Sequence, residues 1–445
     1  MNTSPTSFII TGGTPLQGKV RLSGAKNASY KLMIASLLGT TASTINNLPE
    51  ISDVMMVAEI IRSLGGQTST LDHGTQTINP QGLESFAIDE QYGEISRAST
   101  LFIAPLLARF GEARVPLPGG DKIGKRPLER HFEGLRKMGA VFGQEGNSLV
   151  VQAEKLVGTH YRFAKNTHTG TETMIMAAVL AKGKTVLANA AAEPEVDDLI
   201  LFLNTMGARI VRTRARTIEI EGVASLEGAN HTVMPDRNEA VSYACAALAT
   251  RGDIVVTDAR PTDLAAFLAK LTEIGAGFEI TADGIRFFYQ GPLQATDVET
   301  AIHPGFMTDW QPLWAVLMCH AQGQSTIHET VMQNRFQYID VLRAMGATIK
   351  VVQPQLTAEP EQVYNFNWVD SHAADVHAIQ ITGPTQFRGG EFTAPDLRAG
   401  AIILIAAVSG TGQTILHNIS QIERGYSQID EKLTSLGARI QRVTA

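Results

Sequence analysis

The chain has 445 residues, of which 44% are hydrophobic and 18% charged, and its formal net charge is −7. This composition is ordinary for a globular protein, and the length suggests two or three domains. The acidic balance argues against broad binding to nucleic acid or to an anionic membrane, which favours a basic surface. The N-terminal residues lack the pattern of a signal peptide, and the longest apolar run is too short to span a bilayer.

Only two cysteines are present, Cys245 and Cys319, and both lie in apolar stretches. A disulfide framework is therefore not expected, and a reducing cytoplasm is the simplest location. We expect both thiols to be buried and inert.

A pattern of helix, glycine, β-branched run, polar loop, helix and glycine occurs six times. The closing glycines are 74, 68, 68, 71 and 91 positions apart. A near-constant period indicates one supersecondary unit copied six times. Helices that alternate with strands predict an α/β (α+β) fold in layers. The closing glycines are Gly65, Gly139, Gly207, Gly275, Gly346 and Gly437.

Three polar clusters interrupt the first two copies. The segment SGAKNA, residues 23–28, places Lys26 and Asn27 before a helix-like stretch, which suits an anion. Arg97 precedes an apolar run, and by itself is typical of a surface charge. The glycine-rich segment 117–127 contains Asp121 and Arg126 and resembles a mobile lid.

The third copy gives the clearest helix. Apolar residues spaced by three and four predict an amphipathic helix over residues 196–206, capped by Gly207 and followed by a strand. The polar segment near residues 230–235 then divides the six copies into three and three. The apolar residues of the predicted helix are Val196, Leu199, Ile200, Leu203 and Met206.

The second half of the chain contains the remaining candidates. Asp309 follows a Pro-Gly turn and precedes an apolar helix, where it could cap the helix or act as a general base. Arg335, Arg398 and Arg424 lie in or beside polar loops, and paired arginines suit phosphate and carboxylate groups. The segment near 352–378 is rich in Pro, Asn and Asp and is interpreted as an insertion in a surface loop of the fifth copy.

Together these phrases resemble the enolpyruvyl transferase family from one end of the chain to the other. The resemblance implies a two-domain inside-out α/β barrel of six βαβαββ-type repeats, three per domain. One domain would hold residues 22–233 with the lid 117–127, and the other residues 1–21 plus 234–445, with the active site in the inter-domain cleft. The matching phrases are SGAKNA, LPGG-x-x-IG-x-RP, AAAEPEVDD, MPDRNE, HPGFMTDWQ, ETVMQNRF, DLRAGA and ERGY.

The resemblance also implies a reaction. Phosphoenolpyruvate would donate its enolpyruvyl group to the 3′-hydroxyl of UDP-N-acetylglucosamine by addition and elimination through a tetrahedral intermediate. Phosphate would leave, without a metal or organic cofactor, in the first committed step of peptidoglycan synthesis. The implied ligands of phosphoenolpyruvate are Lys26, Arg126 and Arg424, supported by Arg97, Arg335 and Arg398. Asn27 would orient the sugar, Asp309 would take the hydroxyl proton, and Lys26 and Arg398 would also take part in catalysis.

Two departures from the family pattern affect these expectations. Asp121 stands where the family usually has a lid cysteine, so we expect the protein to resist fosfomycin, which alkylates that thiol. The family's Lys-x-Ser-x-Gly stretch for the diphosphate reads Asn-Thr-His-Thr-Gly here, with His168, Thr169 and Gly170 as candidate ligands. A different hydroxyl acceptor, or a non-catalytic regulator that binds a nucleotide sugar, therefore stays open. The sequence leaves the oligomeric state open as well.

Overall fold

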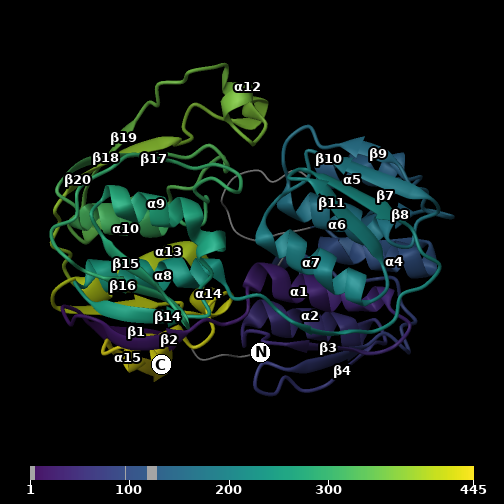
Figure 1. Ribbon diagram of the computed structural model, residues 1–445, viewed down its shortest axis with the longest axis horizontal. Helices are drawn as coiled ribbons and strands as arrows, with labels where there is room; N and C mark the ends of the chain where they lie inside the picture. Colours follow the sequence, from purple (N-terminus) through teal and green to yellow (C-terminus); the bar gives the residue numbers. More distant parts are fainter. Residues whose placement is uncertain (1–5, 96, 118–127, 445) are drawn as a thin grey trace. The chain divides into compact units, whose positions relative to one another are not determined.

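The computed structural model describes residues 6–95, 97–117 and 128–444, which fall into two compact units. One unit holds the chain up to Ser23 and again from Pro235 onward, and we call it the terminal unit (Figure 1). The other holds the chain from Gly24 to Met234, and we call it the middle unit. Each is described by itself below.

The sheets of both units follow one plan. In the terminal unit, strand β14 (Asp253–Thr257) pairs in parallel with β2 (Gln17–Arg21) and antiparallel with β16 (Gly284–Phe288), which continues to β15 (Gly277–Thr281). A second sheet described in this unit has the strand order β17 (Val298–Glu299), β18 (Gly323–His328), β20 (Ala378–Gly383) and β19 (Thr348–Val352). A third has the order β21 (Glu391–Thr393), β22 (Gln413–His417), β1 (Thr6–Thr11) and β23 (Arg439–Thr444).

The middle unit repeats this plan in its described residues. The sheets are β13 (Asn230–Thr232), β3 (Ser43–Asn46), β5 (Gln76–Asn79) and β4 (Gln67–Thr68); β9 (His160–Arg162), β10 (Lys184–Ala188), β12 (Thr217–Glu221) and β11 (Arg209–Arg214); and β6 (Glu112–Pro116), β8 (Ser148–Gln152) and β7 (Val141–Glu145). One of its sheets, β6-β8-β7, has only three described strands. An isolated parallel β-bridge between Ala87 and Arg114 takes the place of a fourth strand there.

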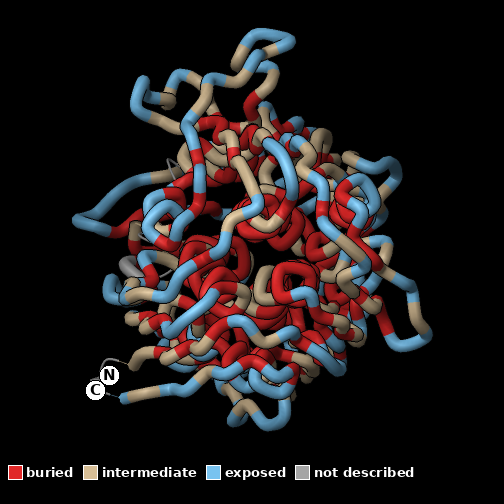
Figure 2. The backbone as a smooth tube through the Cα atoms, turned by 90° about the vertical axis from the view of Figure 1, so that its left-hand side faces the viewer, coloured by how far each residue is buried: buried red, intermediate tan, exposed pale blue. Residues whose placement is uncertain are grey.

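Helices without a solvent-exposed face lie at the centre of the terminal unit. Every residue of α8 (Arg237–Ala249) is buried, and α8 packs against α10 (Gln311–His320) and α13 (Leu397–Ser409). A helix that is buried all round needs neighbours on every side. The burial colouring agrees, since helical coils are red and most loops pale blue (Figure 2). The other helices here are α9 (Ala265–Glu273), α11 (Ile339–Ala344), α12 (Pro360–Val363), α14 (Ser420–Glu423) and α15 (Ile429–Ser435), with 3₁₀ helices η3 (Pro261–Leu264) and η4 (Trp368–Asp370).

The middle unit has a corresponding core in which α1 (Lys26–Ala35) and α6 (His168–Ala178) are largely buried. The other helices described here are α2 (Ser52–Ser63), α3 (Gln91–Ile95), α4 (Ile103–Phe110), α5 (Glu129–Lys137) and α7 (Pro194–Thr205), with η1 (Ser36–Leu38) and η2 (Arg97–Phe102). Helix α6 packs against α4, α5 and α7.

The helix predicted in the third copy is confirmed as α7. All five residues of its apolar stripe are buried. Gly207 follows with a φ of 106°, a left-handed conformation that favours glycine, and β11 begins two residues later. The α/β class is likewise confirmed by the mixed sheets and helices.

Both cysteines are buried and free, as predicted, and burial raises the pKa of Cys319 to about 12. In the described part of the chain, no helix is both long and apolar enough to cross a membrane. The expected insertion connects β19 to β20 and contains α12 and η4.

Candidate active site

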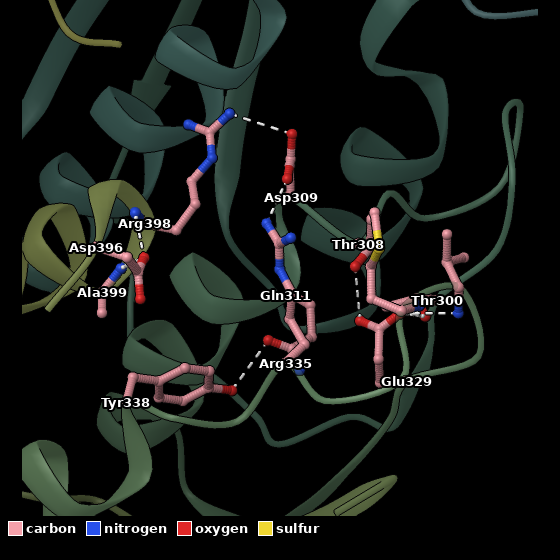
Figure 3. A network of polar contacts seen from close by, with 12 residues as sticks. Thr300, Thr308, Asp309, Gln311, Glu329, Arg335, Tyr338, Asp396, Arg398 and Ala399 are labelled. Atoms are coloured by element: carbon pink, nitrogen blue, oxygen red, sulfur yellow. Dashed lines mark hydrogen bonds and ion pairs between the residues drawn. The ribbon is translucent and has the colours of Figure 1, made fainter. Parts of the chain in front are cut away.

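Asp309 lies in the turn before α10 and is held by two arginines (Figure 3). Arg335 donates a short hydrogen bond from Nη2 to Oδ1, and Arg398 donates from Nη2 to Oδ2 over 3.1 Å. The structure thus brings together three residues predicted from the sequence. Asp309 is not the helix cap, because the residue at the N-cap of α10 is Trp310.

The charges of this cluster are coupled. Burial alone would raise the pKa of Asp309, but the guanidinium groups of Arg398 and Arg335 outweigh it and hold that pKa well below its usual range. Burial opposes the charge of Arg398 as well, yet the Asp309 carboxylate raises its pKa. One carboxylate between two guanidinium groups leaves a net positive charge, which suits an anionic ligand.

Helix α13 fixes the position of Arg398. Its N-cap, Asp396, accepts hydrogen bonds from the backbone N–H groups of Arg398 and Ala399 over 2.8 and 3.0 Å. Arg398 also donates from Nη1 to the hydroxyl of Tyr426 over 3.1 Å, and that hydroxyl lies 2.7 Å from the hydroxyl of Ser242. The guanidinium is therefore held on two sides before any ligand binds.

A small cavity opens beside the two arginines. It adjoins the first turns of α10 and α13, so its wall combines guanidinium groups with apolar side chains. Such a mixture is typical of a site for a small molecule. Its lining residues are Pro312, Arg335, Gln337, Tyr338, Asp396, Arg398, Ala399 and Ile402.

Arg424 is the C-cap residue of α14, and its Nη1 donates to the side chain of Gln421 over 3.4 Å. Both residues belong to the terminal unit.

A second carboxylate, Glu329, lies next to this cluster and was not singled out from the sequence (Figure 3). Its oxygens accept from the hydroxyls of Thr300 and Thr308, each over 2.9 Å, and from the N–H groups of Val331 and Met332. Burial raises its pKa, although these backbone bonds oppose the shift. Thr308 adjoins Asp309, so Glu329 anchors the turn that presents Asp309.

In the middle unit, Lys26 is the first residue of α1, and its Nζ lies 2.6 Å from Oδ2 of Asp53 in α2. Both side chains are mostly buried. Asn27, the next residue, is half-buried. Asp53 was not predicted as a site residue, although it is a carboxylate in a largely apolar helix.

Helix α6 begins at His168, and the hydroxyl of its N-cap, Thr167, accepts from the N–H of Gly170 over 3.2 Å. The predicted ligands His168, Thr169 and Gly170 therefore form the first turn of a helix, where anions are favoured.

The ring of His168 contacts two buried charges that the sequence reading missed. Nε2 lies 3.1 Å from Oε1 of Glu172, whose other oxygen lies 2.5 Å from Nζ of Lys31. Either charged residue is conspicuous in the sequence, because its neighbours along the helix are mostly apolar or small.

For three predicted site residues, the structure describes the backbone alone or no atoms. Asp121 and Arg126 lie outside the described residues, as does most of the predicted lid. Arg97 begins η2, and the structure describes its backbone alone. In the described part of the chain, no three His, Cys, Asp or Glu side chains are grouped so that they could hold a metal ion.

Small mixed sheets around buried helices, with an arginine-held carboxylate, define an α/β protein with a site for an anionic ligand. A family model described as EPSP synthase (3-phosphoshikimate 1-carboxyvinyltransferase) matches residues 10–433. The chain belongs to this family, and the resemblance to enolpyruvyl transferases is confirmed.

Curated relatives match the chain over nearly its full length. Proteins named UDP-N-acetylglucosamine 1-carboxyvinyltransferase from Idiomarina loihiensis and Koribacter versatilis are 40% and 38% identical to it. The matches cover 98% of this chain in both cases, and 99% and 96% of the relatives.

Solved structures have the same fold. The enolpyruvyl transferase NikO from Streptomyces tendae aligns with a TM-score of 0.84 at 24% identity, over 99% of this chain and 100% of the other. An EPSP synthase from Acinetobacter baumannii aligns with a TM-score of 0.71 at 19% identity, over 98% and 100%.

Proposed function

We propose that this protein transfers the enolpyruvyl group of phosphoenolpyruvate to the 3′-hydroxyl of UDP-N-acetylglucosamine and releases phosphate. This reaction is the first committed step of peptidoglycan synthesis. The observation that carries the proposal is the Asp309 carboxylate between Arg335 and Arg398, in a chain with full-length relatives that are named for this activity.

Asp309 is the proposed general base for the acceptor hydroxyl. Its low pKa keeps it ionised, but a carboxylate held so low accepts a proton weakly. Phosphoenolpyruvate carries several negative charges and competes for the guanidinium groups of Arg335 and Arg398. When the two guanidinium groups also bind the negatively charged substrate, they stabilise the Asp309 carboxylate less. The pKa of Asp309 then rises, and its basicity increases. Substrate binding therefore activates the base.

Phosphoenolpyruvate would be bound by several cationic side chains, because its phosphate and carboxylate groups need fixed positive charges. Lys26, Arg126 and Arg424 would bind it directly, with Arg97, Arg335 and Arg398 in support. Asp121 would protonate the methylene carbon, and addition of the hydroxyl at the neighbouring carbon would give a tetrahedral intermediate. Elimination of phosphate from that intermediate, with return of a methyl proton to the Asp121 carboxylate, would restore the double bond and complete the transfer. The lid 117–127 would exclude water meanwhile.

The binding site for the acceptor nucleotide sugar is proposed to lie in the middle unit. Asn27 would orient the sugar, and His168, Thr169 and Gly170 would bind the diphosphate at the first turn of α6. No metal or organic cofactor is required by this scheme, and a cytoplasmic location is part of the proposal.

The proposal extends to the finer architecture. Residues 22–233 and residues 1–21 plus 234–445 would each contain three of six βαβαββ-type repeats, in an inside-out α/β barrel. Because the assigned ligands come from both parts, the reaction would require both in one active site between the domains.

The test is phosphate release from phosphoenolpyruvate by the purified full chain, with the product mass determined. With UDP-N-acetylglucosamine we expect release and the enolpyruvyl ether. Asp309→Ala should abolish turnover but keep acceptor affinity within about tenfold, or roughly 1.4 kcal/mol. Asp283→Asn is the matched control, because Asp283 is an exposed carboxylate of the same unit.

Other results identify other functions. Release with a different hydroxyl compound alone would indicate another acceptor. Binding of the nucleotide sugar without release from any acceptor would indicate a non-catalytic regulator. Wild-type turnover in Asp309→Ala would contradict the assignment of the base.

A further inference from the structure

Arg442, on the last strand β23, holds two carboxylates that come from different helices. Its Nε and Nη2 donate to Oδ2 and Oδ1 of Asp430 in α15, each over 3.0 Å. Its Nη1 donates a short hydrogen bond to Oε1 of Glu423, the last residue of α14. One guanidinium thus ties both helices to the strand, and we call these three residues the C-terminal clamp.

An aromatic ring fixes the orientation of this guanidinium. Phe8 of β1 is the cross-strand partner of Arg442, and its fully buried ring has its centroid 5.3 Å from Cζ of the arginine. A planar guanidinium can lie against a ring and pair with both oxygens of a carboxylate at once, which a lysine ammonium cannot. Although the Arg442 side chain is 41% exposed, that of Asp430 is only 11% exposed, so this pair is better shielded than an ordinary surface ion pair.

The clamp lies next to Arg424 in the chain, because Arg424 directly follows Glu423. Helix α14 has four residues, and a helix of a single turn has little stability of its own. Its position therefore depends on tertiary contacts. One is made by Ile422, which is fully buried and packs so closely on Gly400 of α13 that a Cβ there would stand 2.7 Å from its Cγ1. A second is the hydrogen bond from Arg442 to Glu423.

The segment that follows Arg424 is held at both of its ends. Tyr426, two residues further on, is buried, and its hydroxyl accepts a hydrogen bond from Nη1 of Arg398 over 3.1 Å. Asp430 lies in the first turn of the next helix, α15. The stretch of chain that carries Arg424 therefore runs between two carboxylates that one guanidinium holds. A displacement of either carboxylate would move the backbone from which the Arg424 side chain extends.

We propose that Arg442 is a positioning residue for the donor site, which holds Glu423 and Asp430 so that the neighbouring Arg424 can bind phosphoenolpyruvate. This inference rests on the proposed function, which assigns Arg424 to that substrate. It deepens that function by giving the C-terminal strand a part in donor affinity. Loss of the clamp should therefore raise KM for phosphoenolpyruvate and leave KM for the acceptor unchanged, because the residues proposed to bind the acceptor nucleotide sugar lie in the middle unit.

The test compares the steady-state kinetics of full-length variants at position 442. Arg442→Met keeps an apolar stem against Phe8 and removes the planar fork. We expect its KM for phosphoenolpyruvate to rise about tenfold, with KM for UDP-N-acetylglucosamine unchanged. Arg442→Lys keeps the charge but cannot pair with both carboxylates in this geometry, so we expect a rise of similar size. Arg439→Met is the matched control, since Arg439 is an exposed arginine of the same strand, and both KM values should stay at the wild-type level.

A double-mutant cycle separates positioning from a general effect on stability. In an Arg424→Lys background, Arg442→Met should raise KM for phosphoenolpyruvate by less than about twofold more, because the residue through which it acts is already changed. Glu423→Gln removes the negative charge next to Arg424 and should raise the same KM while KM for the acceptor stays constant. Each variant is measured at a temperature at which its thermal unfolding curve shows it to be folded. If Arg442→Met does not fold, Arg442→Lys and Glu423→Gln provide the same comparison.

The outcomes are distinct. A folded Arg442→Met variant with the wild-type KM for phosphoenolpyruvate would overturn this inference and leave the proposed function intact. A rise in KM that is just as large in the Arg424→Lys background would have the same meaning, as would a wild-type KM in Arg442→Lys, since charge alone would then be sufficient. If the wild-type protein releases no phosphate from phosphoenolpyruvate with any acceptor, the proposed function is wrong, and this inference fails with it.

Discussion

The guanidinium of Arg398 reaches the carboxylate of Asp309 over 3.1 Å, although the two residues are 89 positions apart. This contact joins the first turn of α13 to the turn before α10, while Arg335 binds the other carboxylate oxygen. A carboxylate with two guanidinium partners is stabilised in its charged form. The stability of the protein should therefore depend on this group in a definite pH range.

The first prediction concerns Asp309→Asn and the free energy of unfolding. Removing one partner of a mostly buried ion pair leaves uncompensated charge, and we expect a loss of about 3 kcal/mol at pH 7. Since the folded pKa of Asp309 is lowered, its contribution is present above the unfolded pKa and is lost as the pH falls toward the folded pKa. The difference between variant and wild type should thus stay constant from pH 8 to 5 and shrink below about pH 4.

Denaturant titration across this range is the measurement. Asp340→Asn serves as the control, because the Asp340 side chain is 91% exposed and its pair with Arg343 should contribute little. A difference for Asp309→Asn that already shrinks between pH 7 and 5 would mean that the arginines do not hold this carboxylate in its charged form.

Local sequence pattern was sufficient for single elements of the scaffold. The apolar stripe over residues 196–206 predicts α7 because its spacing matches the helical period, and Gly207 marks its end. The same spacing contains no information about pairing between distant segments. Asp309, Arg335 and Arg398 could be grouped from the sequence through the family resemblance alone.

The missed residues have a common physical cause. Lys31, Glu172 and Glu329 are charged residues that the fold buries, and their partners lie on other segments. An interpretation of the sequence by hydrophobic periodicity places a single charged residue in an apolar stretch at the surface. For Lys31 and Glu172, a charge whose neighbours along the helix are mostly apolar or small is the signal that would have marked them. Glu329 directly follows His328 and carries no such signal.

Glu329→Gln provides the second prediction. Burial raises the folded pKa of Glu329, so the favourable contribution of its protonated form is present below the unfolded pKa and is lost as the pH rises through the folded pKa. A glutamine oxygen at the place of Oε1 can keep three of these contacts without charge, and the amide NH2 can donate to the Thr308 hydroxyl, which then accepts. The variant should therefore gain stability relative to wild type as the pH rises from 5 to 8.

Thermal unfolding at several pH values measures this difference, with the exposed Glu431→Gln as control. A gain of up to about 1 kcal/mol is expected at pH 8, the size of one net hydrogen-bond contribution. A loss of stability for Glu329→Gln that grows with pH would show that the ionised carboxylate is the favoured form.

The third prediction concerns fosfomycin and Asp121. A carboxylate is a far weaker nucleophile toward an epoxide than a thiolate, so the wild-type protein should retain full activity after incubation with the compound. Asp121→Cys should restore time-dependent inactivation and a covalent adduct at that residue. Intact-mass measurement identifies the adduct, with Asp121→Asn as the variant without a nucleophile. An adduct at Asp121 in the wild-type protein would contradict the prediction.

The fourth prediction gives the segment between β19 and β20 a role in the site. The amide of Gln333, two residues before Arg335, donates to the carbonyl of Asp370 over 2.6 Å and to the carboxylate of Asp375 over 2.8 Å. The loop that presents Arg335 is thereby tied to the insertion. Gln333→Leu keeps the size of the side chain and removes both bonds.

We expect Gln333→Leu to lower kcat/KM about tenfold, equal to roughly 1.4 kcal/mol, because Arg335 is held less firmly against Asp309. The free energy of unfolding should fall by about 1–3 kcal/mol, since the Asp370 carbonyl and the Asp375 carboxylate, both in half-buried residues, each lose a donor. Gln362→Leu, at an exposed position of the same insertion, should leave both quantities unchanged. If Gln333→Leu loses stability but keeps full kcat/KM at a temperature where it is folded, the insertion stabilises the loop without positioning Arg335.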